Sequence, residues 1–581
     1  MDLGGEAVAP RPLEDGTAAD AIVALLVAQG VETFFGIPGG PVSPVFDAIF
    51  RHPRARLVQS RHEAAAAFSA TAYGRASGKV AAVVVTAGPG ATNAVTGIAS
   101  AHFEGVPVVL IVGDVAWAAD GERLLQSSGR EGLDVEGMFG TITRRCVRVS
   151  KPASAAAQAS AVVAAASDPD HPGPAMLVVP IHLAAAPASA MRVVGTGVAS
   201  STTVDRSIVQ DTCRRLAEAE RPLLVLGAGA RPFADAVRDV VETLRIPFVT
   251  TPKAKGLLPE THLASLRNGG LAASAWAREY TAAGVDMALV LGTDLDDCSI
   301  GPTPYVSAGG TLVHVDRDAT VFGRNLPTRT GVVADVGTFV EAMRAVTTHH
   351  AVTHRRAFDE LARLRERSPF VQAPYVDHDA ARVHPADAIV SLQAAAGPGV
   401  AFTTDIGEHM LFALHYLTID APDAFQIQLG LGSMGSGIGG AIGLALADPT
   451  RLVVCICGDG GMQMAGMEIL VAARERLPIA FAVFNDGRYN MVHHGFAQVF
   501  GHDAPWDSHA IDFAAWARSI GVTGHRIDDL TQICAERLRG PRAGEGPVVL
   551  DIRIDPDIRM AGGGRNEALQ HMSMLARGTD V

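Results

Sequence analysis

Apolar strands that alternate with helices predict an α/β protein made of three doubly wound parallel-sheet domains. The alternation occurs in three separate blocks of the 581-residue chain. The strands are continuous apolar runs, as expected where both faces of a sheet are covered. Several runs end in glycine-rich turns that carry polar residues, which is typical of the ligand-binding edge of such sheets.

The blocks are separated by segments of different composition. A Ser/Thr/Gly-rich stretch at 195–203 precedes the second block, and a charged segment at 354–368, expected to be a solvated linker helix, precedes the third. The predicted domains are 1–185, 204–346 and 385–556, followed by a tail, 557–581, that could close over a site. Strands of the first domain are expected at Thr33–Phe35, Leu57–Gln59, Ala81–Thr86 and Val106–Val112.

Composition and charge narrow the classes of function. The chain is 48% hydrophobic and 19% charged, which is ordinary for a soluble α/β enzyme. Its net charge of −13 argues against nucleic acid or an anionic membrane as a partner. The six cysteines are scattered, so no disulfide framework is expected. The first 15 residues lack a secretory apolar core, and no run of 18 apolar residues occurs, so we expect a cytoplasmic protein.

Two acidic turns in the third block carry the most specific signal. The apolar run Leu452–Cys457 ends in Gly-Asp-Gly-Gly at 458–461, and a second run, Ile479–Phe484, ends in Asn485-Asp486-Gly487. A crossover helix, expected at Met464–Arg476, would make the two strands parallel neighbours. Asp459 and Asp486 would then face one another at one sheet edge. Hard oxygen ligands beside free N–H groups suit a divalent cation that holds a diphosphate.

The spacing of these turns resembles the thiamine-diphosphate motif, in which Gly-Asp-Gly is followed by a closing Asn pair. Here 24 residues separate Gly460 from Asn485. The resemblance implies thiamine diphosphate and Mg²⁺ as cofactors. It also implies that Asp459, Asp486 and the main-chain oxygen of Arg488 bind the metal. Asp replaces the usual second Asn, which leaves open whether Asn485 takes the ligand role instead of Asp486.

The first block contains a second group of motifs. Arg61-His62-Glu63 opens a helix directly after a strand, while the loops at 35–40 and 86–93 also follow strands. A glutamate in a first helical turn is most often structural. The three loops, however, would gather at one edge of one sheet. Together they resemble the pyrimidine-binding domain of the acetohydroxyacid synthase group, and this similarity extends over almost the whole chain. It implies that Glu63 binds the pyrimidine, with Pro38, Gly39, Gly88 and Asn93 also in contact with the cofactor.

The resemblance assigns the remaining cofactor residues to the third block. The strand-to-helix turn at 404–409 is similar to a diphosphate-binding turn, and Gly430–Gly435 is similar to the segment that grips the pyrimidine. Met434 stands where family members have an apolar residue that bends the cofactor, although a methionine can also fill a core gap. The implied contacts from this block are Gly407, Glu408, His409, Gly432, Met434, Asp459, Gly460, Gly461, Asp486, Arg488 and Tyr489.

The family implies carbon–carbon chemistry next to a carbonyl. Glu63 would share a proton with N1′ of the pyrimidine, and a 2-oxo acid would be decarboxylated and its remainder joined to a second carbonyl compound. Alternatives are a simple 2-oxo acid decarboxylase, a hydrolase of diketones, and a non-catalytic scaffold that keeps the fold. The resemblance also implies a homodimer or homotetramer with sites at subunit interfaces.

The chain departs from the acetohydroxyacid synthase pattern after the Asn-Asp pair. Gly495 stands where these enzymes usually carry a tryptophan that helps to select the acceptor. His493 and His494 precede it and could act as general acid and base or bind a carboxylate, because imidazole titrates near neutrality. The alternative is a solvated turn.

The signal for a flavin in the middle block is weak. Gly227-Ala228-Gly229 follows a strand but lacks the third glycine of a dinucleotide fingerprint. Flavin-binding relatives carry arginines around an Asp pair, where this chain has Thr293 and Cys298. FAD is therefore considered but not favoured.

Overall fold

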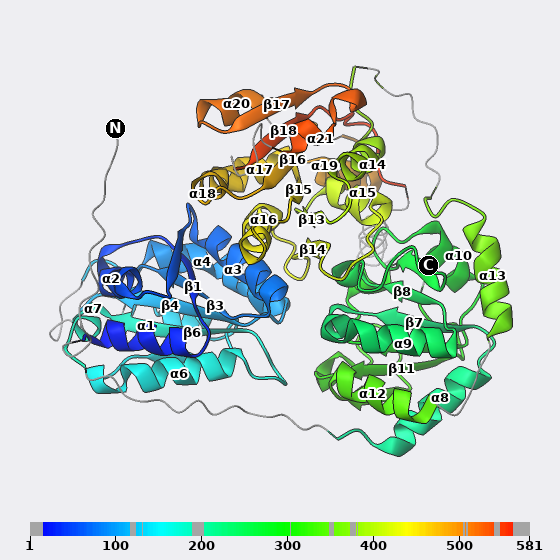
Figure 1. The fold of residues 1–581 in the computed structure, drawn as a ribbon, viewed down its shortest axis with the longest axis horizontal. Helices are drawn as coiled ribbons and strands as arrows, with labels where there is room; N and C mark the ends of the chain where they lie inside the picture. Colours follow the sequence, from blue (N-terminus) through cyan, green and yellow to red (C-terminus); the bar gives the residue numbers. More distant parts are fainter. Residues whose placement is uncertain are drawn as a thin grey trace. The chain divides into compact units, whose positions relative to one another are not determined.

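The computed structural model describes residues 16–561 except 117–123, 131, 189–202, 302–303, 348–353, 372–378, 380, 504–505, 507–508 and 540–545. Three six-stranded sheets, all parallel, account for the strands of this part of the chain (Figure 1). The predicted α/β fold with three parallel sheets is confirmed. The described residues of the chain form two compact units. One unit lies within 1–199, Gln428–Pro449 and Ala465–Leu477, and the other lies within 200–427, Thr450–Met464 and 478–581.

The first sheet has the strand order β2-β1-β3-β4-β6-β5. Its strands are β1 (Thr33–Gly36), β2 (Arg56–Gln59), β3 (Ala81–Val85), β4 (Val108–Asp114), β5 (Cys146–Arg148) and β6 (Pro174–Pro180). Helices α1 (Ala18–Ala28), α2 (Ser43–Arg51) and α6 (Ala155–Ala166) cover one face, and α3 (Glu63–Ser77) and α4 (Pro89–Phe103) lie on the other (Figure 1). Shorter helices are α5 (Val135–Phe139) and α7 (Ile181–Ala184). Because both faces are covered, the strands are apolar throughout.

The middle sheet has the order β12-β11-β10-β7-β8-β9. Its strands are β7 (Pro222–Leu226), β8 (Phe248–Thr250), β9 (Ser265–Asn268), β10 (Met287–Leu291), β11 (Thr311–Asp316) and β12 (Thr330–Val333). Its helices are α8 (Arg206–Glu218), α9 (Ala234–Leu244), α10 (Ala275–Ala282), α11 (Asp297–Ile300), α12 (Val336–Thr347) and α13 (Arg355–Arg365). The charged segment predicted to be a solvated linker forms α13, but Leu361 and Leu364 are buried in the core on one face of this sheet. The prediction of a helix is confirmed, and its description as solvated is wrong.

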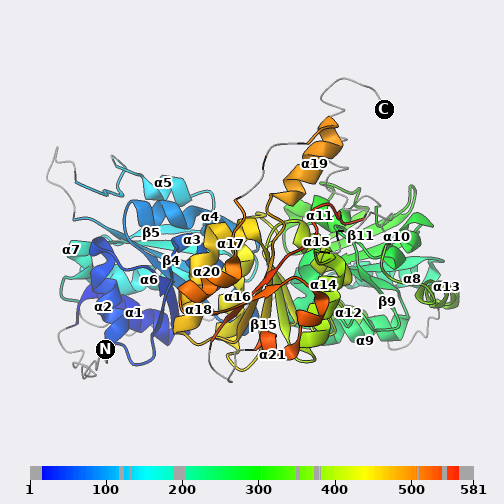
Figure 2. The same ribbon diagram turned by 90° about the horizontal axis from the view of Figure 1, so that it is seen from above.

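The third sheet has the order β14-β13-β15-β16-β18-β17. Its strands are β13 (Ala401–Thr404), β14 (Phe425–Ile427), β15 (Val453–Gly458), β16 (Ile479–Phe484), β17 (Thr523–Ile527) and β18 (Val548–Ile552). The helices of this part of the chain are α14 (Pro385–Ala396), α15 (Glu408–Tyr416), α16 (Ser436–Ala447), α17 (Asp459–Ala465), α18 (Ile469–Arg474), α19 (Asn490–Phe500), α20 (Phe513–Ser519) and α21 (Ala535–Leu538). Figure 2 shows α19 projecting from the third sheet.

The predicted crossover helix at 464–476 differs from the structure. Helix α17 begins at Asp459 itself, inside the Gly-Asp-Gly turn, and a 3₁₀ turn at Gly466–Glu468 separates it from α18. The glycines that were expected to form a loop therefore belong to a first helical turn, whose N–H groups are free of partners within the helix. Such a turn is suited to bind an anion.

Two general expectations can be compared with the described residues. Within them, no helix is long and apolar enough to cross a membrane. Each of the six cysteines is a free thiol, as the scattered positions predicted.

Candidate active site

Strand pairing brings the two acidic turns to one edge of the third sheet. β15 and β16 are parallel neighbours, and Gly458 pairs with Phe484, so the turns that follow them begin at the same level. Asp459 is 5% exposed, and its carboxylate joins the turns. Oδ1 accepts a hydrogen bond from the N–H of Gly460 at 2.8 Å, and Oδ2 accepts one from the N–H of Gly487 at 3.0 Å.

Asp486 lies in the electrostatic field of a second carboxylate. Burial and the nearby negative charge of Asp459 raise the pKa of Asp486 well above its ordinary value, and Glu408 adds to the effect. The N–H of Arg488 donates to Asp486 Oδ1 at 3.1 Å. Two desolvated carboxylates at close range repel each other, and a divalent cation between them would remove that cost.

The amide nitrogen of Asn485 is engaged elsewhere, whereas its Oδ1 is buried and has no hydrogen-bond partner among the described residues. Asn485 is 1% exposed, and Nδ2 donates to Asp551 Oδ1 at 2.7 Å and to the carbonyl of Ile511 at 2.9 Å. Asp551 belongs to β18, on the other side of β16 from β15. The Asn485 amide nitrogen is thus held toward β18, whereas Asp486 is the residue of the pair that interacts with Asp459.

A histidine packs beneath the turns. His409 is buried, and burial lowers its pKa to about 4, so the ring is neutral at physiological pH. A Cβ at Gly458 would lie 3.0 Å from the His409 ring, and one at Gly407 would lie 2.5 Å from it. Glycine at both positions therefore lets the two strand ends close around this ring.

Glu408 and His494 form a buried pair beside the same edge. His494 Nδ1 donates to Glu408 Oε2 at 2.7 Å, and the N–H of Met560 donates to Glu408 Oε1 at 3.3 Å. His493, on the same helix, lies 3.5 Å from the carboxylate of Asp503. Both histidines are buried, at 7% and 4% exposed, so the interpretation as a solvated turn is wrong.

The other residues around the acidic turns differ in exposure. Tyr489 is 37% exposed, and Arg488 extends to Asp557 and to the carbonyl of Pro556, both at 2.7 Å. These contacts fix the chain that follows β18 onto the turn after β16. Of the C-terminal tail that could close over the site, residues 562–581 lie outside the described residues.

The motifs of the first block also converge, at an edge of the first sheet. β1 pairs with both β2 and β3, so the loops that follow these strands lie side by side. Glu63 is the first residue of α3 and is 7% exposed. Asn93, on α4, donates from Nδ2 to Glu63 Oε2 at 3.0 Å. A Cβ at Gly90 would lie 2.9 Å from the side chain of Thr86 and 3.5 Å from Glu63 Oε1, so Gly90 packs closely against Thr86 beside this carboxylate.

The loops beside Glu63 need glycine for geometric reasons. Gly88, which precedes α4, has φ = 64°, and a Cβ at Gly39 would lie 2.5 Å from the side chain of Thr86. Pro38 is exposed next to Gly39. The buried hydroxyl of Thr86 has no hydrogen-bond partner among the described residues. Small residues and an unused donor beside a buried carboxylate are features expected of a ligand site.

The Met434 segment belongs to the same compact unit as Glu63. The N–H of Gly430 donates to Glu104 Oε1 at 2.7 Å, and Glu104, which follows α4, also pairs with Arg75 of α3. Gly432 and Gly435 both have positive φ, 68° and 86°. The backbone on each side of the half-buried Met434 is thus bent in a way that only glycine adopts readily. The role of Met434 as a wedge stays a prediction.

Comparisons with known proteins identify the family. Models described as Thiamine pyrophosphate enzyme match in three parts: the N-terminal TPP binding domain at 16–134, the central domain at 209–343 and the C-terminal TPP binding domain at 405–552. The chain belongs to the thiamine pyrophosphate enzyme family. A putative acetolactate synthase large subunit from Mycobacterium tuberculosis is 30% identical, with 93% of this chain and 98% of that protein covered.

Further relatives carry similar names. An acetolactate synthase from Mycobacterium bovis is 29% identical over 96% of this chain and 92% of its own length. One from Bacillus subtilis is 28% identical over 94% of each chain. The predicted resemblance is confirmed, and the protein is a thiamine-diphosphate-dependent enzyme similar to acetolactate synthases.

The described residues fit the cofactor of this family. Within them, no three side chains of His, Cys, Asp or Glu form a metal site by themselves. The acidic turns instead offer two carboxylates. The charge of Asp459 disfavours the ionised form of Asp486, so a cation that binds both suits them. The first turn of α17 supplies N–H groups, and the buried Glu63 carboxylate suits a ring nitrogen.

The middle domain gives structural reasons for its glycines. A Cβ at Gly227 would overlap the carbonyl oxygen of Gly292, so this glycine is required by the close approach of two strand ends. Arg231 donates to the carbonyls of Lys253 and Pro422, and Lys253 Nζ lies 3.1 Å from Asp294. Both side chains thus have partners within the protein. The prediction of no tightly bound flavin stays a prediction.

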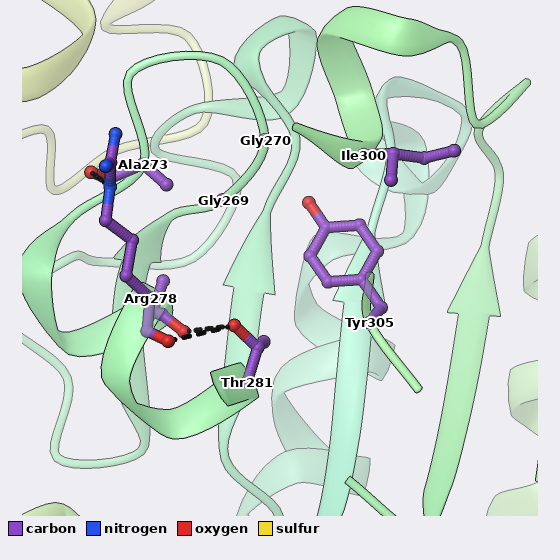
Figure 3. A pocket seen from close by; sticks show the side chains of 8 residues that line it. Gly269, Gly270, Ala273, Arg278, Thr281, Ile300 and Tyr305 are labelled. Carbon is purple, nitrogen blue, oxygen red and sulfur yellow. Dashed lines mark hydrogen bonds between the residues drawn. The ribbon is translucent and has the colours of Figure 1, made fainter. Parts of the chain in front are cut away.

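A small pocket in the middle domain is separate from the predicted site residues. It lies beside α10 and is lined by Gly269, Arg278, Ile300 and Tyr305, among others (Figure 3). The Tyr305 hydroxyl donates to the carbonyl of Ser299 at 2.5 Å, and the Thr281 hydroxyl donates to the carbonyl of Ala277 at 2.8 Å. These hydroxyl groups already have partners within the protein.

Sequence reasoning missed the acidic residues that hold the motifs. Glu104 binds the Met434 segment and Glu468 binds the turn before Glu63. Neither lies in a recognisable motif, and each acts on a residue more than 300 positions away in the chain. No local pattern could have revealed these contacts.

Proposed function

We propose that this enzyme decarboxylates a pyruvate-like 2-oxo acid and ligates the product to a second carbonyl compound, using thiamine diphosphate and Mg²⁺. The observation that carries the proposal is the pair of buried acidic sites, Asp459 with Asp486 and Glu63 with Asn93, in a chain that aligns with acetolactate synthases over nearly its whole length. When bound, thiamine diphosphate supplies the nucleophilic carbon and the electron sink for decarboxylation.

In this proposal the acidic turns anchor the cofactor. Asp459, Asp486 and the carbonyl of Arg488 would bind Mg²⁺, and the first turn of α17, which contains Gly460 and Gly461, would face the diphosphate. Gly407, Glu408, His409 and Tyr489 border the same site. The negative charge of Asp459, which acts on Asp486, supports Asp486 as the metal ligand of the pair, and Asn485, whose Oδ1 has no hydrogen-bond partner among the described residues, is the alternative.

Glu63 would share a proton with a ring nitrogen of the pyrimidine. A buried carboxylate accepts a short, strong hydrogen bond from a protonated ring nitrogen, because little water competes for it. Asn93 fixes the carboxylate by binding Oε2. Pro38, Gly39 and Gly88 would shape the loops around the pyrimidine ring. Met434, with Gly432 beside it, would pack against the cofactor and hold it bent.

His494 is the group that we assign to proton transfer with the substrate. Glu408 accepts from Nδ1 and orients the ring, which leaves Nε2 to exchange a proton. His493 is proposed as its neighbour in binding a substrate carboxylate. Gly495 is buried beside them and adds no side chain, so the acceptor side is wider than in acetohydroxyacid synthases that carry tryptophan there.

The assembly and location follow from the family resemblance. We propose a cytoplasmic homodimer or homotetramer in which each site forms between subunits, with small 2-oxo acids and carbonyl acceptors as its partners and neither nucleic acid nor membrane among them.

A product assay tests the proposal. The purified protein is incubated with thiamine diphosphate, Mg²⁺ and a panel of 2-oxo acids, alone and with aldehydes, and products are identified by mass. We expect a hydroxyketone that contains both reactants together with release of carbon dioxide, and Glu63→Gln should abolish both. Glu475→Gln is the matched control. Release of a free aldehyde alone would indicate a simple decarboxylase, cleavage of a diketone would indicate a hydrolase, and an inert protein that binds cofactor would indicate a scaffold.

A further inference from the structure

One buried carboxylate has no place in the chemistry described above. Glu468 ends the 3₁₀ turn between α17 and α18 and is 1% exposed. Its Oε1 accepts hydrogen bonds from the N–H of Arg61 at 2.9 Å and from the N–H of His62 at 2.7 Å. Its Oε2 is buried and has no hydrogen-bond partner among the described residues.

The two N–H groups lie directly before Glu63. His62 is the N-cap of α3 and Glu63 is its first residue. Main-chain N–H groups at a helix start have no partner within the helix, and an acceptor that binds them fixes the direction in which the chain enters. Asn93 binds the carboxylate of Glu63. Glu468 therefore holds the main chain directly before Glu63, and Asn93 holds the end of its side chain.

Keeping a carboxylate at this position is costly to the fold. Burial raises the pKa of Glu468 to about 7, and the nearby Glu63 carboxylate contributes in the same direction. The two N–H donors and the charge of Arg61 oppose this shift but do not cancel it. An apolar side chain would avoid the cost, although it could not bind the two amides.

We propose that Glu468 is a positioning residue for Glu63, acting through the main-chain amides of Arg61 and His62. This inference rests on the proposed role of Glu63 in binding the pyrimidine. Glu468 sets the direction of the Glu63 side chain and thereby the affinity for the cofactor. It also places a second titratable carboxylate in the electrostatic field of Glu63.

Three variants distinguish the effect of the length of the residue 468 side chain from the effect of its charge. Glu468→Ala removes both acceptor and charge, Glu468→Asp keeps the charge but is one methylene too short to bring an oxygen to the two amides, and Glu468→Gln keeps an acceptor oxygen. The matched control is Glu475→Gln, which removes a carboxylate from the same segment, where it pairs with the partly exposed Arg56.

The readouts include two that need no substrate. Hydrogen exchange of the apoprotein reports on residues 60–66, and calorimetry gives the Kd for thiamine diphosphate with Mg²⁺. We expect Glu468→Ala and Glu468→Asp to accelerate exchange in this segment and to weaken cofactor binding by about tenfold, the size of the loss of a helix cap. Glu468→Gln should keep the exchange pattern and the Kd within about threefold, while it shifts the pH profile of kcat.

The outcomes distinguish this inference from the proposed function. Exchange and cofactor affinity unchanged in Glu468→Ala or Glu468→Asp, or changed equally in Glu475→Gln, would overturn the positioning role. If Glu468→Ala does not fold, the comparison of Glu468→Asp with Glu468→Gln tests the positioning role in the same way. A wild-type protein that shows the expected cofactor affinities but forms no ligated product would overturn the proposed function alone.

Discussion

The raised pKa of Glu468 makes the stability of the apoprotein depend on pH in a calculable way. The ordinary pKa of a glutamate is 4.5, and in the folded protein it rises to about 7. The folded state therefore holds the proton more tightly than the unfolded state does. Stability from this group is fully present below pH 4.5 and is lost as the pH rises through 7. At about 1.4 kcal/mol for each pKa unit, the loss is about 3 kcal/mol.

The substitution Glu468→Gln isolates this contribution, because glutamine resembles the protonated acid at every pH. The groups that face Glu468 and remain are Arg61, His62 and Glu63. Near pH 4.5 the variant and the wild type should unfold at similar temperatures. At pH 8 the variant should be more stable by about 3 kcal/mol, which is roughly 6–12 °C in unfolding temperature for a compact unit of this size.

The assay is calorimetric unfolding of both proteins without cofactor, at one scan rate and at several pH values. Glu475→Gln should differ from wild type by less than about 1 kcal/mol throughout, because its ion pair with Arg56 is partly exposed. The reasoning would be refuted if the unfolding temperatures of Glu468→Gln and wild type changed equally with pH between pH 4.5 and pH 8. Equal changes would mean that Glu468 titrates alike in the folded and unfolded states.

Three further predictions follow from other contacts. Lys255, 0% exposed, forms an ion pair with Glu260 at 2.7 Å, so Lys255→Met should lower the free energy of unfolding by about 3–5 kcal/mol; equal stability of this variant and wild type in urea would contradict this. Gly443→Ala would place a Cβ against the carbonyl oxygen of Ser69, where α16 meets α3, and should cost at least about 2 kcal/mol in thermal unfolding, whereas Gly40→Ala meets open space and should change stability by less than about 0.5 kcal/mol. Chelation of Mg²⁺ or Asp459→Asn should weaken thiamine diphosphate binding by on the order of 100-fold in calorimetry, and an unchanged Kd would show that Asp459 does not hold the metal.

Much of the active site could be predicted because its parts are local. Gly458–Gly461 and Asn485–Gly487 each follow an apolar strand, so pattern and spacing alone placed them at one sheet edge. The helix was misjudged there: the run at 464–476 was expected to be continuous, but α17 begins at Asp459 and a 3₁₀ turn follows it. Glycines lower helix propensity, and the sequence does not reveal that tertiary packing overrides it.

The histidines illustrate a second limit. His493 and His494 could have been a solvated turn or a buried site, and local sequence did not choose between them. Burial and the contact between His494 and Glu408 decided the question, and that contact joins residues 86 positions apart. The charged helix α13 was misjudged for the same reason, since only its neighbours show that Leu361 and Leu364 enter a core.

The sequence by itself determined the three parallel sheets, the two acidic turns and the loop that carries Glu63, because strand periodicity, glycine turns and motif spacing are properties of short segments. Only the tertiary structure decided that Asn485 binds Asp551, that Glu408 orients His494 and that Glu468 holds the amides before Glu63. Each of these contacts depends on how distant segments pack, and the pKa of Glu468 is set by that packing and not by its neighbours in the chain.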